Sequence, residues 1–185
     1  MDASVWTTPD PESIAPFLST TWATIDAALD LAQVRSQDTV LDIGCGDGRV
    51  LVAHIKRGGS RAVGVELNST ALDIAREHIN SALGSVSESV DFVHGSFESV
   101  ELDSLPVAAG GRLVIFCFLL PEGLAKVASW VRAQHTLLLA QNRESSIILC
   151  SLGWQLPGLP KHREAIVPGS GTAIYVYKLN DKAQR

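Results

Sequence analysis

The stretch with the clearest chemical signature is Val40-Leu-Asp-Ile-Gly-Cys-Gly-Asp-Gly-Arg-Val50, which has glycines at positions 44, 46 and 48 and acids at 42 and 47. Glycines this close together let a ligand approach the backbone, as in sites for phosphates, dinucleotides and other nucleoside cofactors. A dinucleotide fingerprint has the spacing Gly-x-Gly-x-x-Gly, and a phosphate loop has Gly-Lys-Ser/Thr; neither occurs here. The spacing therefore argues against a ligand held through a pyrophosphate.

A second candidate contact for a nucleoside is the carboxylate of Glu66. Glu66 stands 22 residues after Gly44, at the end of the apolar segment Ala62-Val-Gly-Val-Glu66. At the end of the next parallel strand, a carboxylate lies beside the first loop and accepts hydrogen bonds from two ribose hydroxyls. NAD also satisfies this requirement, but a dehydrogenase normally needs more chain to build a substrate domain. NAD-dependent redox chemistry is therefore the less favoured alternative.

The apolar periodicity indicates which elements position these groups. Helices are expected after caps at 19–21 and 68–69, after Gly48, and from Pro121. Continuous apolar runs typical of a parallel sheet covered on both faces predict strands at 39–43, 62–66, 90–94, 112–118 and 136–141. The segments 164–167 and 173–179 flank a Pro-Gly-Ser-Gly-Thr turn with no room for a crossover helix, and we expect an antiparallel hairpin there. The fold class is α/β, doubly wound and mostly parallel.

Length and composition limit the remaining possibilities. The 185 residues are 46% hydrophobic and 19% charged, which suits one globular domain. We expect a proline-rich N-terminal arm over 1–18 and a single domain over 19–185. The formal net charge is −5, so no overall basic field attracts a nucleic acid, and a nucleic-acid partner is not expected.

The cysteines and the N-terminus point to the cytoplasm. Three widely separated cysteines, with no Cys-x-x-Cys pair, indicate neither a disulfide scaffold nor a zinc site; the histidines share no metal spacing, so no metal is expected. The first 20 residues contain acids but no Arg or Lys, unlike a signal or transit peptide. The longest uncharged apolar run, 113–120, has eight residues, whereas a membrane span needs roughly 20. A reducing, cytoplasmic setting without a membrane partner is predicted.

The motifs "VLDIGCGDGRV" and "AVGVELN", followed by the C-terminal hairpin, resemble those of the class I S-adenosylmethionine-dependent methyltransferases over roughly residues 19–179. The resemblance implies a Rossmann-like, seven-stranded sheet of order 3-2-1-4-5-7-6 with helices on both faces, and S-adenosylmethionine as the cofactor. It places Asp42, Gly44 and Gly46 against the methionine half of the cofactor, Glu66 on the ribose diol and Leu67 against the adenine. Further cofactor contacts are expected from Asp47, Ser96 and Phe97.

A narrower resemblance concerns the methyl acceptor. "PFLST", "DIGCGDGRVLVA", "GVELN" and "FCFLLPEGLAKV" are similar to the small lysine methyltransferases that act on ATP synthase c subunit and the adenine nucleotide translocator, and to their prokaryotic relatives. This implies a protein lysine as acceptor, with a small-molecule amine, hydroxyl or acid next. Ser96 replaces the acid usually found after the third strand, which favours a third hypothesis, a non-catalytic partner-binding module.

The chemistry of methyl transfer indicates where to look for catalytic residues. Displacement at a sulfonium releases a neutral thioether, so the enzyme mainly aligns the acceptor and excludes water. A lysine amine, with an unperturbed pKa of about 10.4, must first lose a proton, which a dry aromatic pocket favours. Phe118, at the end of the predicted fourth strand, and Pro121, just after it, are the candidates for such a wall, although Phe118 also suits the core. Glu122 is the candidate base, and its alternative role is to complement a helix dipole.

Overall fold

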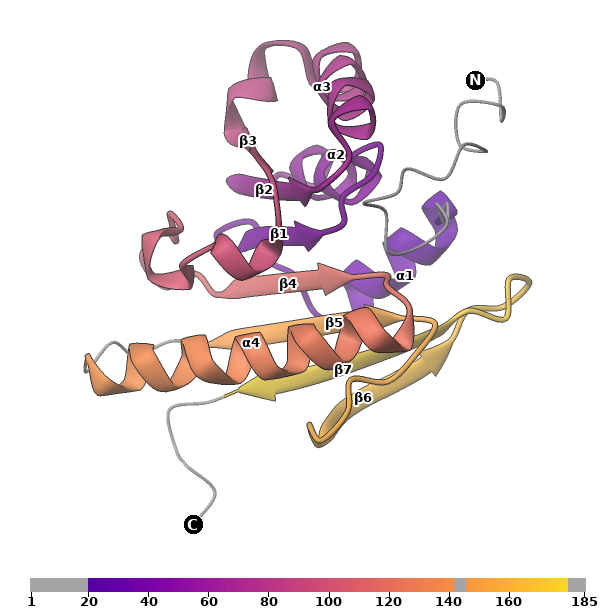
Figure 1. The fold of residues 1–185 in the computed structure, drawn as a ribbon. Coiled ribbons are helices and arrows are strands. Elements are labelled where there is room, and N and C mark those ends of the chain that lie inside the picture. Colours follow the sequence, from indigo (N-terminus) through magenta and orange to yellow (C-terminus); the bar gives the residue numbers. More distant parts are fainter. Residues whose placement is uncertain (1–19, 142–145, 180–185) are drawn as a thin grey trace.

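The computed structural model describes residues 20–141 and 146–179, and one seven-stranded sheet runs through them. The strand order is β3-β2-β1-β4-β5-β7-β6 (Figure 1). Strands β1 to β5 are parallel, and β7 pairs antiparallel with both β5 and β6. The bounds are β1 Thr39–Ile43, β2 Arg61–Glu66, β3 Val90–His94, β4 Leu113–Cys117, β5 Ile147–Leu152, β6 Lys161–Ile166 and β7 Ala173–Leu179. The predicted order and hairpin are confirmed.

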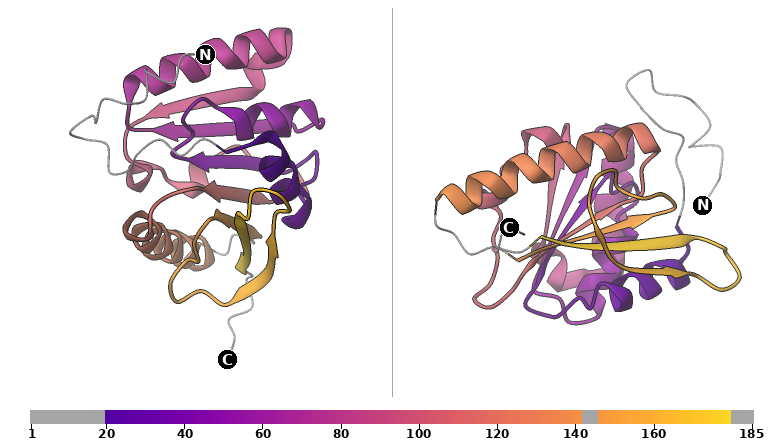
Figure 2. Two further views of the ribbon diagram at one scale, coloured as in Figure 1. Left: turned by 90° about the vertical axis from the view of Figure 1, so that its right-hand side faces the viewer. Right: turned by 90° about the horizontal axis from the view of Figure 1, so that it is seen from below.

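Four α-helices cover the two faces of the sheet in the described residues. Helices α1 (Trp22–Leu31), α2 (Arg49–Lys56) and α3 (Ser69–Leu83) lie on one face, and α4 (Pro121–Ala140) lies on the other (Figure 2). Short 3-10 helices η2 (Gly84–Ser89), η3 (Phe97–Ser99) and η4 (Leu102–Ser104) fill the connections. Each face therefore buries its own apolar cluster, as a doubly wound fold requires.

The helix boundaries follow from local chemistry. The Thr21 hydroxyl accepts a hydrogen bond from the Thr24 amide and caps α1, and Asn68 caps α3 by accepting from the Ala71 amide. Pro121 occupies the first turn of α4, where its missing N–H costs nothing. The predicted cap at Ser19 and the predicted arm over 1–18 lie outside the described residues.

One predicted strand is wrong. The segment 136–141 is not a strand; 136–140 forms the last part of α4, and the fifth strand is Ile147–Leu152. The run Leu137-Leu-Leu-Ala140 is uniformly apolar in sequence, yet Leu138 is 6% exposed whereas its neighbour Leu137 is 56% exposed. Leu138 continues the buried helical stripe of Leu124 and Val131, so helical spacing, rather than apolar content, decides the conformation.

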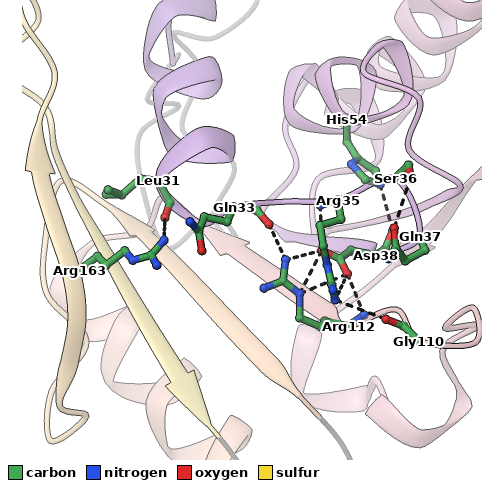
Figure 3. Close-up of polar contacts among 10 residues, drawn as sticks. All are labelled: Leu31, Gln33, Arg35, Ser36, Gln37, Asp38, His54, Gly110, Arg112 and Arg163. Atoms are coloured by element: carbon green, nitrogen blue, oxygen red, sulfur yellow. Dashed lines mark hydrogen bonds and ion pairs between the residues drawn. The ribbon is translucent and has the colours of Figure 1, made fainter.

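A buried ion pair joins the amino ends of β1 and β4, at the opposite end of these strands from the glycine turn. Asp38 is fully buried and accepts hydrogen bonds from the backbone amides of Arg35 (2.9 Å) and Arg112 (2.9 Å) and from Nη2 of Arg112 (2.6 Å) (Figure 3). Burial alone raises the pKa of Asp38, but these donors outweigh it and leave the pKa below its ordinary value. The contact joins chain segments that are far apart in sequence, so its role is structural.

Candidate functional site

The predicted site residues gather at the carboxyl edge of the parallel strands. In the register of the sheet, Ile43 at the end of β1 pairs with Val65 of β2 and with Cys117 of β4. The glycine turn after β1, Glu66 at the end of β2, and Phe118 after β4 therefore lie along one edge. This is the edge at which ligands bind in doubly wound sheets.

The glycine turn is pinned to β2. The amides of Gly44 and Cys45 both donate to the Val65 carbonyl, at 2.8 and 3.0 Å, and the backbone of Gly44 has φ +74°. A Cβ on Gly44 would stand 3.2 Å from Cδ2 of Leu119 in the segment after β4. Only a glycine fits both this left-handed conformation and the close approach of that segment. Gly44 is exposed, so its backbone is open to a ligand.

Glu66 has a fixed orientation. Its Oε2 accepts a hydrogen bond from the Gly46 amide at 3.0 Å, and its Oε1 accepts one from the Asn68 amide at 3.0 Å. Each carboxylate oxygen keeps a second acceptor site, because an ionised carboxylate offers about four in all. Glu66 is therefore held ready to accept hydrogen bonds from two adjacent hydroxyls, as the ribose of a nucleoside requires.

Asp42 is a buried acid without a donor. Its residue is 6% exposed, and within the described parts of the chain no group donates a hydrogen bond to its carboxyl. Burial, with the nearby charges of Glu66 and Asp47, raises the pKa of Asp42 to about 8. A cation beside these three acids would relieve this repulsion. The ammonium group of the methionine half of S-adenosylmethionine supplies such a cation, so the acids and the Glu66 acceptors fit that cofactor.

Asp47 is held by residues that the sequence analysis did not select. Its Oδ2 lies 2.7 Å from Nε of Arg49, and its carbonyl oxygen lies 2.8 Å from Nδ1 of His78 in α3. Nη1 of Arg49 also donates to the carbonyl of Thr20 at 3.0 Å. Arg49 directly follows Gly48 in the glycine motif, and this position in the sequence could have identified it as a candidate site residue.

The segment after β3 lies on the side of β2. The hydroxyl of Ser96 accepts from the Glu98 amide (3.3 Å) and lies 3.3 Å from Oε2 of Glu98. A carboxylate thus accompanies Ser96, two residues later than the expected acid. Phe97 packs its ring edge-on against Trp130 of α4, with centroids 5.4 Å apart. Leu67 is 38% exposed and stays available to a ligand.

On the side of β1 opposite to β2 and β3, aromatic side chains follow the ends of β4 and β5. Phe118 is half-buried and its ring centroid lies 6.2 Å from that of Trp154, which is 38% exposed. Gly153 permits this arrangement, since a Cβ there would stand 3.0 Å from Cε2 of Phe118. The buried Ser151 hydroxyl donates to the Trp154 carbonyl at 2.5 Å. Trp154 was not among the predicted site residues, because the fifth strand was predicted at 136–141 and the loop after the observed β5 was therefore not considered.

The helix that follows β4 begins three residues after Phe118. Pro121 and Glu122 form the first turn of α4, and both are exposed.

No group of three or more His, Cys, Asp or Glu side chains among residues 20–141 and 146–179 is arranged to hold a metal ion. In the same part of the chain, no helix is long and apolar enough to cross a membrane.

Comparison with known proteins agrees with this geometry. A protein-lysine N-methyltransferase of Saccharolobus islandicus is 31% identical over 93 residues, 50% of this chain and 56% of that protein. A ribosomal protein L11 methyltransferase of Thermotoga maritima is 34% identical over 71 residues, 36% of this chain and 27% of that protein. The chain thus spans about half, or less, of these curated relatives. The crystal structure of an RNA methyltransferase from Salinibacter ruber, in complex with S-adenosyl-L-homocysteine, has a TM-score of 0.69 at 22% identity, covering 91% of this chain and 97% of that one.

The family assignment rests on the region that contains the site. The model of the methyltransferase domain family matches residues 40–138, which is more than half of the chain and includes the glycine turn, Glu66 and the end of β4. The sheet order, the fixed carboxylate and the buried acids agree with that match. The chain belongs to the methyltransferase domain family, whose class I members use S-adenosylmethionine as cofactor.

Proposed function

We propose that this protein transfers the methyl group of S-adenosylmethionine to the side-chain amine of a protein lysine. The observation that carries the proposal is the aromatic pair of Phe118 and Trp154. Phe118 follows the same strand as Leu119, the residue that approaches the glycine turn. The ribose contact is proposed at β2 and the methionine contact at β1, so the cofactor would run along the edge from β2 to β1. Its reactive end would then face the next strands in the sheet, β4 and β5, where the two rings stand.

Each proposed contact has a physical task. Glu66 binds the ribose hydroxyls, Asp42 and the backbone of Gly44 and Gly46 receive the methionine half, and Leu67, Ser96 and Phe97 border the adenine. Asp47, whose carboxylate is paired with Arg49, borders the same half of the cofactor. These groups can orient the cofactor together, because all of them lie at or just beyond the carboxyl ends of the first three strands of one sheet.

The cofactor supplies an electrophilic methyl on a sulfonium, and the residues after β4 and β5 act on the acceptor. Phe118, Pro121 and Trp154 form a wall that excludes water and favours the neutral form of a lysine amine. The proton of the lysine ammonium leaves before the nitrogen attacks, and Glu122, exposed in the first turn of α4, is the proposed group that receives it. The N–C bond then forms as the C–S bond breaks.

The choice of lysine is supported by the relative from Saccharolobus islandicus, which is named a protein-lysine N-methyltransferase. The net charge of −5 opposes binding to a nucleic acid through its phosphates, although the structurally similar Salinibacter ruber protein is named an RNA methyltransferase. A small-molecule amine would use the same wall.

One experiment tests the reaction and the class of acceptor together. Cofactor carrying a radioactive methyl group is incubated with the protein and cell extract, and the products are divided between protease and ribonuclease treatments. We expect label in macromolecules that survive ribonuclease and are lost with protease, and methylated lysine after acid hydrolysis. Phe118→Ala should abolish most of the transfer. Label removed only by ribonuclease would refute the lysine proposal, and no transfer in any fraction would favour the non-catalytic module.

The cofactor is tested separately by calorimetry. S-adenosylhomocysteine and NADH are titrated into the protein in separate experiments. Only the former should produce heat of binding, because the glycine spacing does not suit a pyrophosphate. Binding of NADH alone would refute the assignment of the site.

A further inference from the structure

Arg49 occupies a position that helix formation does not explain. It is the first residue of α2, directly after Gly48, and the first turn of this helix contains no acid. A cation at a helix N-terminus faces the positive end of the helix dipole, which is unfavourable. Its side chain is only 30% exposed, so it is not simply solvated there. The residue must therefore serve contacts other than those of its own helix.

The guanidinium group joins two segments. Its Nε lies 2.7 Å from Oδ2 of Asp47, and its Nη1 donates to the carbonyl oxygen of Thr20 at 3.0 Å, at the point where the chain enters α1. A planar guanidinium can make both contacts at once in fixed directions, whereas a lysine ammonium offers a single point charge. Arg49 thus ties the start of α1 to the glycine turn.

A second contact holds the backbone of the same acid. His78 in α3 lies with Nδ1 2.8 Å from the carbonyl oxygen of Asp47, and since a carbonyl only accepts, Nδ1 carries the proton. The ring of Trp22 in α1 packs edge-on against His78, with centroids 6.1 Å apart. Asp47 is therefore held through its side chain by Arg49 and through its main chain by His78, and its residue is 8% exposed.

We infer that Arg49 is a positioning residue of the cofactor site: it orients the Asp47 carboxylate and holds the entry to α1 against the glycine turn, and so sets the affinity for the cofactor. The inference rests on the proposed cofactor site but on none of the acceptor contacts. It assigns Arg49 a role through Asp47 and not a contact with the reacting atoms.

The test is a double-mutant cycle read by calorimetric titration of S-adenosylhomocysteine. Arg49→Gln should weaken binding by about 10- to 100-fold, the range expected for loss of a charged hydrogen bond. Asp47→Asn should weaken binding as well, and the double variant should lose less affinity than the sum of the two single losses, because part of the effect of each residue passes through their shared contact. Arg49→Lys, which keeps the charge but not the fork, should recover only part of the affinity.

Arg57→Gln is the matched control. Arg57 directly follows α2 and bridges to Asp26 and Asp30 of α1, so its loss loosens the same two helices without touching the glycine turn. Thermal unfolding of all variants separates stability from affinity. We expect unchanged affinity for Arg57→Gln, and Arg49→Lys serves if Arg49→Gln does not fold.

The outcomes are distinct. A wild-type protein that does not bind S-adenosylhomocysteine refutes the cofactor site itself, and this role with it. If the wild type binds, the role of Arg49 alone is refuted by unchanged affinity in Arg49→Gln, by additive effects in the cycle, or by an equal loss of affinity in Arg57→Gln.

Discussion

The substitution Asp42→Asn should stabilise the protein without ligand and weaken its binding of cofactor. Asp42 is buried without a donor, and its pKa in the folded protein is about 8, against an ordinary value of 3.8. This difference in pKa corresponds to roughly 6 kcal/mol, at about 1.36 kcal/mol for each pKa unit, and is an upper limit for the folding free energy lost when the carboxyl is ionised. Asparagine is also polar but never ionises, so the variant is relieved only of the ionisation cost, and we expect a gain of about 2 kcal/mol at pH 9, well below this upper limit.

The pH dependence of this gain has a defined direction. Below about pH 4 the carboxyl is protonated in both folded and unfolded protein, so the wild type carries no ionisation cost. Between about pH 4 and 8 the unfolded state loses the proton while the folded state keeps it, and the wild type loses stability relative to the variant. Above pH 8 both states are ionised and the difference is constant.

Urea unfolding at pH 5, 7 and 9 measures this difference, with Asp73→Asn as the control. Asp73 is exposed on α3 beside Arg76, so its substitution should change the free energy of unfolding little at any pH. A variant that is less stable than the wild type at pH 9, or a difference that does not grow between pH 5 and 9, would contradict the burial of an unpaired acid.

The same variant tests the proposed ammonium contact. At pH 7 the Asp42 carboxyl is mostly protonated, and a ligand ammonium beside it favours the ionised form, so binding of S-adenosylhomocysteine should release up to one proton. Calorimetry in buffers of different ionisation enthalpy measures this number. We expect protons released by the wild type, none from this site in Asp42→Asn, and weaker binding by the variant. Equal release from both proteins would exclude Asp42 from the ligand contact.

Three further predictions concern other groups. Glu66→Ala should weaken binding of S-adenosylhomocysteine by about 1.5–3 kcal/mol, measured by calorimetry, because charged hydrogen bonds to the ribose are lost; an unchanged affinity removes Glu66 from the site. Asp38→Ala should lower the free energy of unfolding in urea by about 3–5 kcal/mol at pH 7, because Arg112 loses its buried partner. The wild type should lose the same contribution as the pH falls through the lowered pKa of Asp38. A loss smaller than this in the variant would contradict the stabilising role of the pair. A thiol reagent should label Cys45, Cys117 and Cys150 only as fast as the protein unfolds, because all three thiols are buried and burial raises their pKa values. Rapid labelling in native buffer would show that the thiols are accessible in the folded protein.

Features encoded by neighbouring residues could be predicted from the sequence. The glycine turn, the carboxylate at the end of β2 and the caps of the helices each depend on a few adjacent residues, and the structure has them where the spacing indicates. The fifth strand was missed because a leucine run satisfies both a buried strand and the end of a long helix, and only the partner surface decides between them. Leu138 meets the sheet and Leu137 faces solvent, which a count of apolar residues does not reveal.

Contacts between distant segments could not be predicted in this way. The pairing of Phe118 with Trp154 requires the ends of β4 and β5 to be adjacent, and the tie from Arg49 to Thr20 requires the start of α1 to return to the glycine turn. Both depend on the packing of the whole sheet and its helices. The residues proposed to hold the cofactor, each at the end of its own strand, could therefore be predicted from local sequence, whereas the residues packed around them could not.

Asp38 and Asp42 are two buried acids near opposite ends of β1 whose surroundings change their pKa values in opposite directions. Both are buried, one just before β1 and the other near its end, and burial by itself raises the pKa of each. Arg112 and two backbone amides stabilise the charge of Asp38, so its pKa falls and the ion pair supports the fold. Asp42 has acids as neighbours instead, and its pKa rises. An acid kept at such a cost, beside an open glycine turn, is best explained by a cation that binds there, which is why the ammonium group of the cofactor is the expected partner of Asp42.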